Sequence, residues 1–174
     1  MTIAMQPIYT QTVGSGGVLN ITFNNIPQTF TDLKIVASVR TARSAGATDD
    51  LGIWFNGGAV SLFSIRALQG SGSAASSFGN ASQTIISNTV VDGNTATVNT
   101  FGSFEVYIPN YTGANFKSVI IDSVQEDNAT AAFSRMIAGL FSSSNAITSM
   151  SFQSSNGFNM LQHSTFTLYG ITKG

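Results

Sequence analysis

The chain has almost none of the histidine and cysteine side chains that catalytic and metal sites commonly use. His163 is the only histidine and cysteine is absent, so a histidine-based triad, a multi-histidine zinc site and a thiolate site all lack their side chains. His163 stands in the segment Gln162-His163-Ser164, just before an apolar run. We interpret it as a residue at the end of a loop, bonded to the backbone or facing solvent. A pH-sensing role is the alternative for a lone histidine, and no neighbouring residue supports it.

Carboxylate chemistry needs two acids that face each other across a cleft, roughly 5–10 Å apart for glycoside hydrolysis. Glu105 is the only acid in a strongly apolar context, and the alternation of its neighbours places it on the polar face of a strand. We therefore expect a solvated glutamate. The pair Asp49-Asp50 is typical of a turn between strands and is expected to face an arginine (Arg40, Arg43 or Arg66). Exposed pairs of that kind are worth only about 0–1 kcal/mol.

Three acids gather in one short segment, Asp122, Glu126 and Asp127, with Asn128 following. Carboxylate and amide oxygens on a loop are ligands that calcium uses. Their spacing matches no EF-hand loop, however, and Asp122 is expected within a strand, away from the others. We interpret the cluster as a solvated turn. The sequence thus predicts no catalytic residue, no cofactor and no metal site, and the protein is not expected to be an enzyme.

Charged residues make up 9% of the chain, whereas a typical soluble domain carries about 25%. The formal net charge is -1, and no basic run could neutralise phosphates, which argues against a nucleic-acid partner. Apolar stretches such as residues 119–121 are far shorter than the roughly 20 residues of a membrane span. Residues 1–7 lack the positive start and apolar core of a signal peptide. We expect a protein made in the host cytoplasm, with no membrane partner.

Low charge also bears on self-association, because charge keeps isolated proteins apart and a near-zero net charge favours contact. The mean hydropathy is +0.19 although no stretch could span a membrane. We therefore expect part of the apolar surface to be covered by other subunits. The alternative is a monomer whose surface is coated with hydroxyls and amides.

Short runs of alternating apolar and polar residues recur along the chain, which is typical of an all-β sandwich or barrel. Strands are predicted over residues 8–13, 18–23, 33–40, 51–56, 60–68, 84–91, 101–108, 116–124, 132–141, 147–152 and 165–171. The expected fold is all-β, a two-sheet antiparallel sandwich of the jelly-roll type with about 8–10 strands. Residues 8–174 would form this single domain. Residues 1–7, which lack alternation, would form an N-terminal arm.

Glycine-rich segments predict the connections. Gly14-Ser15-Gly16-Gly17 and Asn56-Gly57-Gly58 are each expected to join two strands into a hairpin, the latter because Asn and Gly tolerate positive φ. The Gly/Ser/Ala-rich segment 69–80 is expected to be a mobile loop.

Candidate partner contacts are the apolar residues of the arm together with one aromatic residue: Met1, Ile3, Met5, Pro7 and Trp54. The arm residues would reach a neighbouring subunit. Trp54 alternates with Ile53 and Phe55, so it is expected to face a partner or the second sheet. Most other aromatic residues are assigned to the core, where each contributes about 1.5–3 kcal/mol; the clearest inward positions are those of Phe23, Phe55, Phe104 and Phe166.

Several segments resemble small virion proteins of tailed bacteriophages. They are residues 26–33 (IPQTFTDL), 54–57 (WFNG), 101–111 (FGSFEVYIPNY), 138–141 with 146–149, and 164–171 (STFTLYGI). The likeness covers nearly the whole chain, and it is to a family of phage β-sandwich proteins seen as capsid decoration (cement) proteins or in tail-fibre contexts. The resemblance implies a jelly-roll-like module, commonly trimeric, on the outside of a particle. It brings no catalytic residues.

The expected function is therefore that of a capsid decoration protein in the virion. A homotrimer would bind the major capsid protein and stabilise the outer surface of the head. The alternative is a tail-fibre or spike component that recognises a host surface receptor, for which the candidate loop aromatics are Tyr111, Phe116 and Phe158. A polysaccharide-cleaving enzyme that uses Glu105 is the third and weakest alternative.

Overall fold

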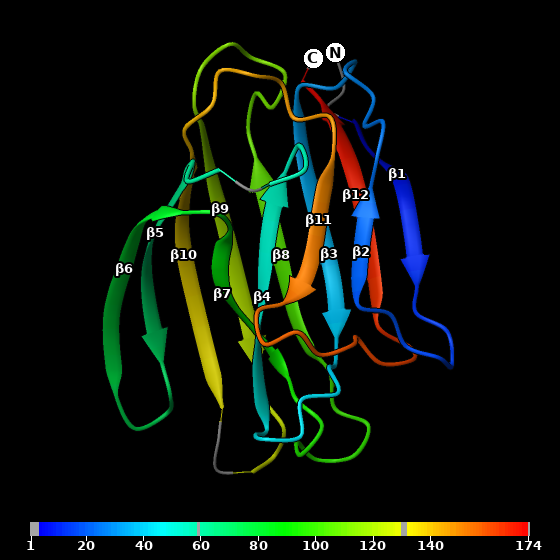
Figure 1. Ribbon diagram of the computed structural model, residues 1–174, viewed down its shortest axis with the longest axis vertical. Helices are drawn as coiled ribbons and strands as arrows, with labels where there is room; N and C mark the ends of the chain where they lie inside the picture. The colour runs from blue at the N-terminus through cyan, green and yellow to red at the C-terminus, as the bar shows by residue number, and fades with distance from the viewer. Residues whose placement is uncertain (1–3, 59, 130–131, 174) are drawn as a thin grey trace.

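The alternating segments form strands throughout the protein. The computed structural model describes residues 4–58, 60–129 and 132–173, and within them the chain forms twelve strands and no helix (Figure 1). The strands are β1 (Ala4–Thr12), β2 (Asn20–Phe23), β3 (Asp32–Val39), β4 (Thr48–Phe55), β5 (Phe63–Gly70), β6 (Ala75–Gln83), β7 (Ile86–Asp92), β8 (Gly102–Ile108), β9 (Lys117–Gln125), β10 (Phe133–Phe141), β11 (Met150–Ser154) and β12 (Thr165–Thr172). A search of these residues for a helix long and apolar enough to cross a membrane finds none.

Two antiparallel sheets pack face to face. The large sheet has the order β1-β12-β3-β8-β9-β10-β5-β6, and the small sheet has the order β2-β11-β4-β7. In Figure 1 the small sheet lies in front of the large one, and β1 and β6 stand at opposite sides of the molecule.

Eight of the strands pair like a long hairpin that has been rolled up: β1 with β12, β2 with β11, β3 with β8, and β4 with β7. This nesting of first with last is the arrangement of a jelly roll. The remaining strands β9, β10, β5 and β6 widen the large sheet beyond β8. The predicted fold class is confirmed. The described residues form twelve strands rather than the 8–10 expected, and β6 lies in a segment predicted to be a loop.

Phenylalanines fill much of the space between the sheets. Two clusters have ring centroids 5.0–6.0 Å apart, namely Phe104 with Phe152 and Phe166, and Phe55 with Phe63 and Phe141. The four residues assigned to the core from the sequence are all buried, which confirms that assignment. The cause is the two-residue period of a strand, which sends every second side chain into the core.

Two of the predicted hairpins are wrong. β1 pairs with β12 and β2 pairs with β11, so Gly14–Gly17 carries the chain from one sheet to the other. Asn56 and Gly57 do adopt positive φ, 53° and 86°. Nevertheless β4 belongs to the small sheet and β5 to the large one. Local turn chemistry sets the backbone conformation of a turn, whereas the pairing of the flanking strands depends on the whole sheet.

The segment expected to be a mobile loop, residues 69–80, instead includes the end of β5 and most of β6, which pair with each other. Likewise, the part of the expected N-terminal arm that the structure describes, residues 4–7, is the start of β1 and pairs with β12. Both strands are at sheet edges, and nearly all of their side chains are exposed on both faces. A strand without a buried face need not alternate between apolar and polar residues, so the sequences of residues 4–7 and 75–83 do not indicate a strand.

Candidate functional site

The described part of the chain leaves the outer face of the large sheet uncovered, since the small sheet packs on its inner face. Five exposed residues of β5, β9 and β10 form what we call the outer apolar patch: Leu68, Ile120, Val124, Met136 and Ala138. Leu68 and Met136 are 61% and 57% exposed. They lie opposite each other on adjacent strands, as do Ala138 and Ile120. Contiguous apolar surface of this kind marks contact sites on soluble proteins.

The outer face also has two shallow hollows, each of about 390 Å³. One lies within the outer apolar patch, between Leu68, Met136 and the half-buried ring of Phe78. The other includes Glu105 and Asp122, which stand directly opposite each other on β8 and β9. Glu105 is exposed, as predicted, and pairs with Lys34 at 2.7 Å. The face therefore presents apolar side chains beside a short acidic strip.

The two edges of the large sheet, β1 and β6, are both nine residues long and carry no charged residue. An edge strand exposes unpaired N–H and C=O groups, and proteins usually protect such edges with charges, prolines or bulges. β1 has this protection in Pro7 and in the register shift that follows it. β6 has no proline, and although its register with β5 shifts between Asn80 and Gln83, residues 75–80 pair regularly, so that part of its edge is open to pairing with another strand.

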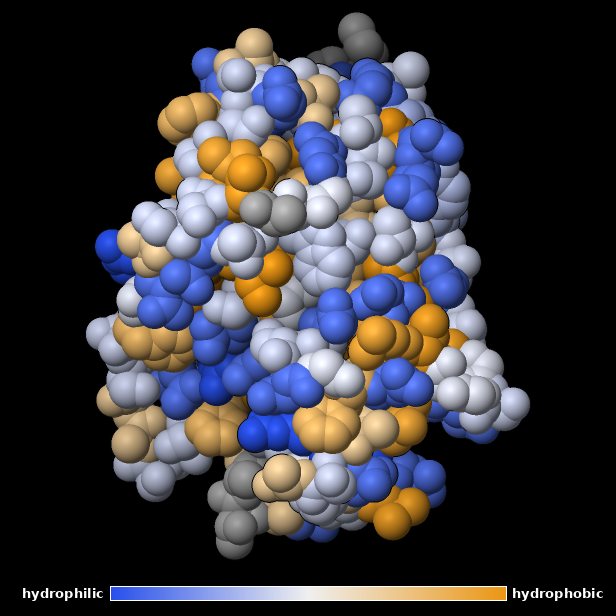
Figure 2. Space-filling model, in the orientation of Figure 1, coloured by the Kyte–Doolittle hydropathy of each residue, from blue (hydrophilic) through white to orange (hydrophobic). Residues whose placement is uncertain are grey.

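Trp54 borders a hollow of about 480 Å³ on the outer side of the small sheet, the side shown in Figure 2. Gly58 lies against the indole: a Cβ atom there would be 2.7 Å from Cδ1 of Trp54. Asn56 holds the turn, since its side-chain amide donates to the carbonyl of Ala146 at 2.8 Å and accepts from the N–H of Thr148 at 2.8 Å. Trp54, expected to face a partner or the second sheet, is half-buried on the face of β4 opposite to the buried Ile53 and Phe55, and Gln153 lines the same hollow.

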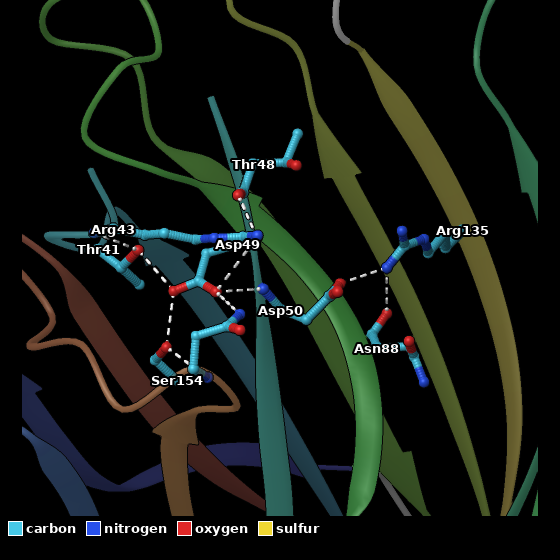
Figure 3. Close-up of polar contacts among 9 residues, drawn as sticks. Thr41, Arg43, Thr48, Asp49, Asp50, Asn88, Arg135 and Ser154 are labelled. Atoms are coloured by element: carbon cyan, nitrogen blue, oxygen red, sulfur yellow. Dashed lines mark hydrogen bonds and ion pairs between the residues drawn. The ribbon is translucent and has the colours of Figure 1, made fainter. Parts of the chain in front are cut away.

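A buried polar cluster surrounds Asp49 (Figure 3). Asp49 is fully buried in β4. It accepts hydrogen bonds from Thr41 Oγ1 at 2.8 Å, Ser154 Oγ at 2.7 Å and Asn156 Nδ2 at 2.7 Å, and Arg43 lies 3.8 Å away. The carboxylate thus directs its hydrogen bonds to other parts of the fold and joins β4 to β11 and the neighbouring loop. Its role is structural.

The neighbour of Asp49 also departs from the expected exposed turn. Asp50 pairs with Arg135 of β10, and the same guanidinium donates to the carbonyl of Asn88 at 3.0 Å (Figure 3). Of the three arginines considered from the sequence, Arg43 does face Asp49. Arg40 instead donates to backbone carbonyls of the loop between β7 and β8.

The predicted partner contacts are only partly within the described residues. Met1 and Ile3 lie outside them. Met5 is 53% exposed, and Pro7 is exposed beside it on β1. Their partners across β12 are Ile171 and Tyr169, so these two side chains border the outer face of the large sheet.

The remaining sequence candidates do not assemble into one site. His163 is exposed in a loop, as predicted, with its N–H donating to the carbonyl of Val13 at 3.0 Å. Of the loop aromatics, Phe116 is 61% exposed, but Tyr111 is fully buried because its hydroxyl donates to the carbonyl of Pro27. Across the described residues, no three His, Asp or Glu side chains come together as a metal site would require.

Asp32 forms a second charged cluster at one end of the outer face. Burial alone would raise the pKa of Asp32, but hydrogen bonds from Tyr107 and Asn110 and the charge of Lys173 outweigh it, so the pKa lies below its usual value. The Tyr107 hydroxyl donates at 2.6 Å, and this bond raises the pKa of Tyr107 to about 12. The cluster joins β3 and β8 to the end of the chain after β12.

A buried polar group of three residues, Asp92, Gln125 and Asp127, was not predicted from the sequence. Asp127, interpreted as part of a solvated turn, is only 1% exposed, and Asp92 and Gln125 are equally buried. Gln125 Nε2 donates to Oδ1 of Asp92 at 2.6 Å. Asp122, by contrast, is exposed on the outer face of β9. Nothing in the local sequence links Asp92 to residues so much later in the chain.

Compared with models of known protein families and with curated proteins, the chain matches none. The case for a function therefore depends on the surfaces described above and on the sequence resemblance.

Proposed function

We propose that this protein is a decoration protein of a tailed-phage head, which binds the major capsid protein through the outer face of its large sheet. The observation that carries the proposal is the outer apolar patch on a broad sheet face that the described chain leaves uncovered. The resemblance of the sequence to phage virion proteins supports the same function.

The size of the outer face is sufficient for a stable contact. Eight strands about 4.8 Å apart span about 34 Å, and seven to nine residues at about 3.3 Å each span about 23–30 Å. The resulting area of about 780–1,020 Å² compares with about 800 Å² on each partner in a standard protein interface. The patch is apolar, whereas Asp122 and Arg66 stand opposite Met136 and Ala138, so salt should weaken binding only moderately.

The edges of the large sheet support a homotrimer. β1 and β6 are unlike each other, and a contact between unlike surfaces of identical subunits can close into a ring. Pairing of β6 from one subunit with residues 9–12 of β1 of the next, beyond Pro7 and the register shift, would satisfy backbone groups that are unpaired in the isolated chain. No charge on either strand opposes this pairing.

The test is binding to purified phage heads that lack the protein. We expect hundreds of copies per head, bound as trimers, and a higher temperature of head disruption. The double variant Leu68→Glu/Met136→Glu should bind more than tenfold more weakly, since it places two charges in the contact. Val98→Glu is the matched control, because Val98 is 79% exposed but lies in the loop between β7 and β8.

Two results would contradict the proposal. One is a stoichiometry of a few dozen copies or fewer per particle. The other is unchanged binding of the double variant when circular dichroism shows that it is folded.

A second candidate function is favoured by the hollow beside Trp54. An indole ring, a side-chain amide (Gln153) and a hydroxyl (Ser155) around an open hollow suit a sugar ring, which stacks on aromatic faces and exchanges hydrogen bonds with polar groups. As a tail-fibre or spike component, the protein would then bind envelope polysaccharide of the host, and Trp54→Ala would abolish that binding. Val98→Ala, which shortens an exposed side chain in the loop between β7 and β8, is the control. Labelled protein found on tails rather than heads would favour this function.

A further inference from the structure

Three buried oxygen atoms near one end of the sandwich have no hydrogen-bond partner among the described residues. They are Oδ2 of Asp92, Oε1 of Gln125 and Oδ2 of Asp127. Asp92 ends β7, Gln125 ends β9, and Asp127 follows in the connection to β10. The bond from Gln125 Nε2 to Asp92 holds the amide beside that carboxylate. Buried polar atoms in folded proteins normally have a hydrogen-bond partner or a ligand. Three unpartnered oxygens in one region therefore indicate a ligand that binds there.

The charges in this region are also unbalanced. Burial raises the pKa of Asp92 and the negative charge of Asp127 raises it further, whereas the hydrogen bond from Gln125, the hydroxyl of Thr100 and the charge of Arg40 offset only part of this. The Thr100 hydroxyl donates its proton to the carbonyl of Thr97 at 2.8 Å. The Arg40 guanidinium donates to oxygens of residues 94–100 and to no carboxylate. Buried carboxylates are strongly unfavourable unless a cation compensates them.

We propose that Asp92, Gln125 and Asp127 bind one calcium ion through these three oxygens. The double positive charge would balance the two carboxylates, and carboxylate and amide oxygens are the ligands that calcium prefers. Calcium accepts six to eight ligands in irregular geometry, so water molecules can complete the shell, whereas magnesium demands near-ideal octahedral geometry. The third protein ligand is an amide, so only two of the three side chains carry a negative charge.

A bound ion would join the two sheets. Asp92 belongs to the small sheet, whereas Gln125 and Asp127 belong to the end of β9 and the turn that follows it in the large sheet. Calcium should therefore stabilise the folded chain itself. This inference is independent of the proposed role on the phage head.

The test uses the full chain, stripped with EDTA and exchanged into chelator-free buffer. Isothermal titration calorimetry with calcium chloride should give one ion per chain. Scanning calorimetry should show Tm rising by about 5–10 °C at a calcium concentration 100-fold above Kd. Asp127→Asn should bind calcium at least tenfold more weakly. Asp122→Asn makes the same change in charge at an exposed position of β9 and should bind like the wild type.

The proposal is overturned if the stripped wild-type protein shows neither binding heat nor a change in Tm at millimolar calcium. It is also overturned if Asp127→Asn and the wild type respond equally. A third contrary result is that Asp92→Asn has a higher Tm than the wild type while the wild type shows no response to calcium. That result would show that Asp92 and Asp127 share a proton. Should Asp127→Asn fail to fold, the wild-type titration still decides the question.

Discussion

Replacement of Asp49 by alanine is expected to destabilise the fold strongly. Its neighbour Asp50 is also an acid, and the local sequence does not distinguish the two. The Asp49 carboxylate accepts three side-chain hydrogen bonds at 2.7–2.8 Å and a fourth from the N–H of Asp50 at 2.8 Å. Alanine leaves these donors without an acceptor in a buried place. It also leaves Arg43 without its carboxylate.

The expected size follows from the burial. Breaking a buried charged network by removing one partner costs about 3–5 kcal/mol. For a domain of this size each kcal/mol corresponds to about 2–4 °C, so Tm should fall by about 6–20 °C. Asp49→Asn should lose only about 1–2 kcal/mol, because it keeps one acceptor oxygen and the hydroxyls of Thr41 and Ser154 can rotate to accept from its amide.

Urea unfolding followed by Trp54 fluorescence measures these differences, provided that the dependence on urea concentration stays the same. Asp50→Ala is the control on the adjacent residue. Its ion pair with Arg135 is partly exposed, so we expect a loss of about 0–1 kcal/mol. Equal losses for Asp49→Ala and Asp50→Ala would refute the reasoning, as would a loss below about 0.5 kcal/mol for Asp49→Ala.

Two further outcomes are expected. Because the folded chain holds the pKa of Asp32 below its usual value of 3.8, the ionised form stabilises the fold above that pH, and this contribution is lost as the pH falls through the folded pKa. The urea midpoint should then fall more steeply on acidification for the wild type than for Asp32→Asn, and parallel curves would show that the cluster contributes nothing. Gly58→Ala should lower the free energy of unfolding by about 1–3 kcal/mol, because Gly58 has a φ of +67° and a Cβ atom there would contact the indole of Trp54. The same contact should shift the emission of this single tryptophan. Gly57→Ala, at a φ of +86° with open space around it, should cost only about 1 kcal/mol, so a larger loss there would count against the contact with Trp54.

The fold class could be predicted because most strands bury one face. In β8, for example, Phe104, Val106 and Ile108 are buried and alternate with the polar residues Ser103, Glu105 and Tyr107. β6 gives no such signal, since both of its faces are exposed and its residues are small and polar. Its strand conformation comes from hydrogen bonds to β5, which the residues of β6 do not encode locally.

The candidate surface residues also divide into those that the local sequence could place and those that it could not. The neighbours of Trp54 place it on the face of its strand opposite to Ile53 and Phe55, but they leave open whether that face meets a partner or the second sheet. The outer apolar patch could not be assembled, because Leu68 meets Met136, and Ile120 meets Ala138, only after β5, β9 and β10 are placed side by side. Asp127 was misinterpreted for a similar reason: its burial depends on β7, whose last residue is Asp92.

By itself, the amino-acid sequence determined the strand periods, the inward phenylalanines, the positive φ of the Asn56-Gly57 turn and the scarcity of reactive side chains. All of these depend on residues a few positions apart, through backbone sterics and the two-residue repeat of a strand. Only the tertiary structure decided which strands pair, which edges stay open and which acids are buried together. Those properties depend on contacts between distant segments, whose free energy is shared by the whole sandwich and is not contained in any one stretch of chain.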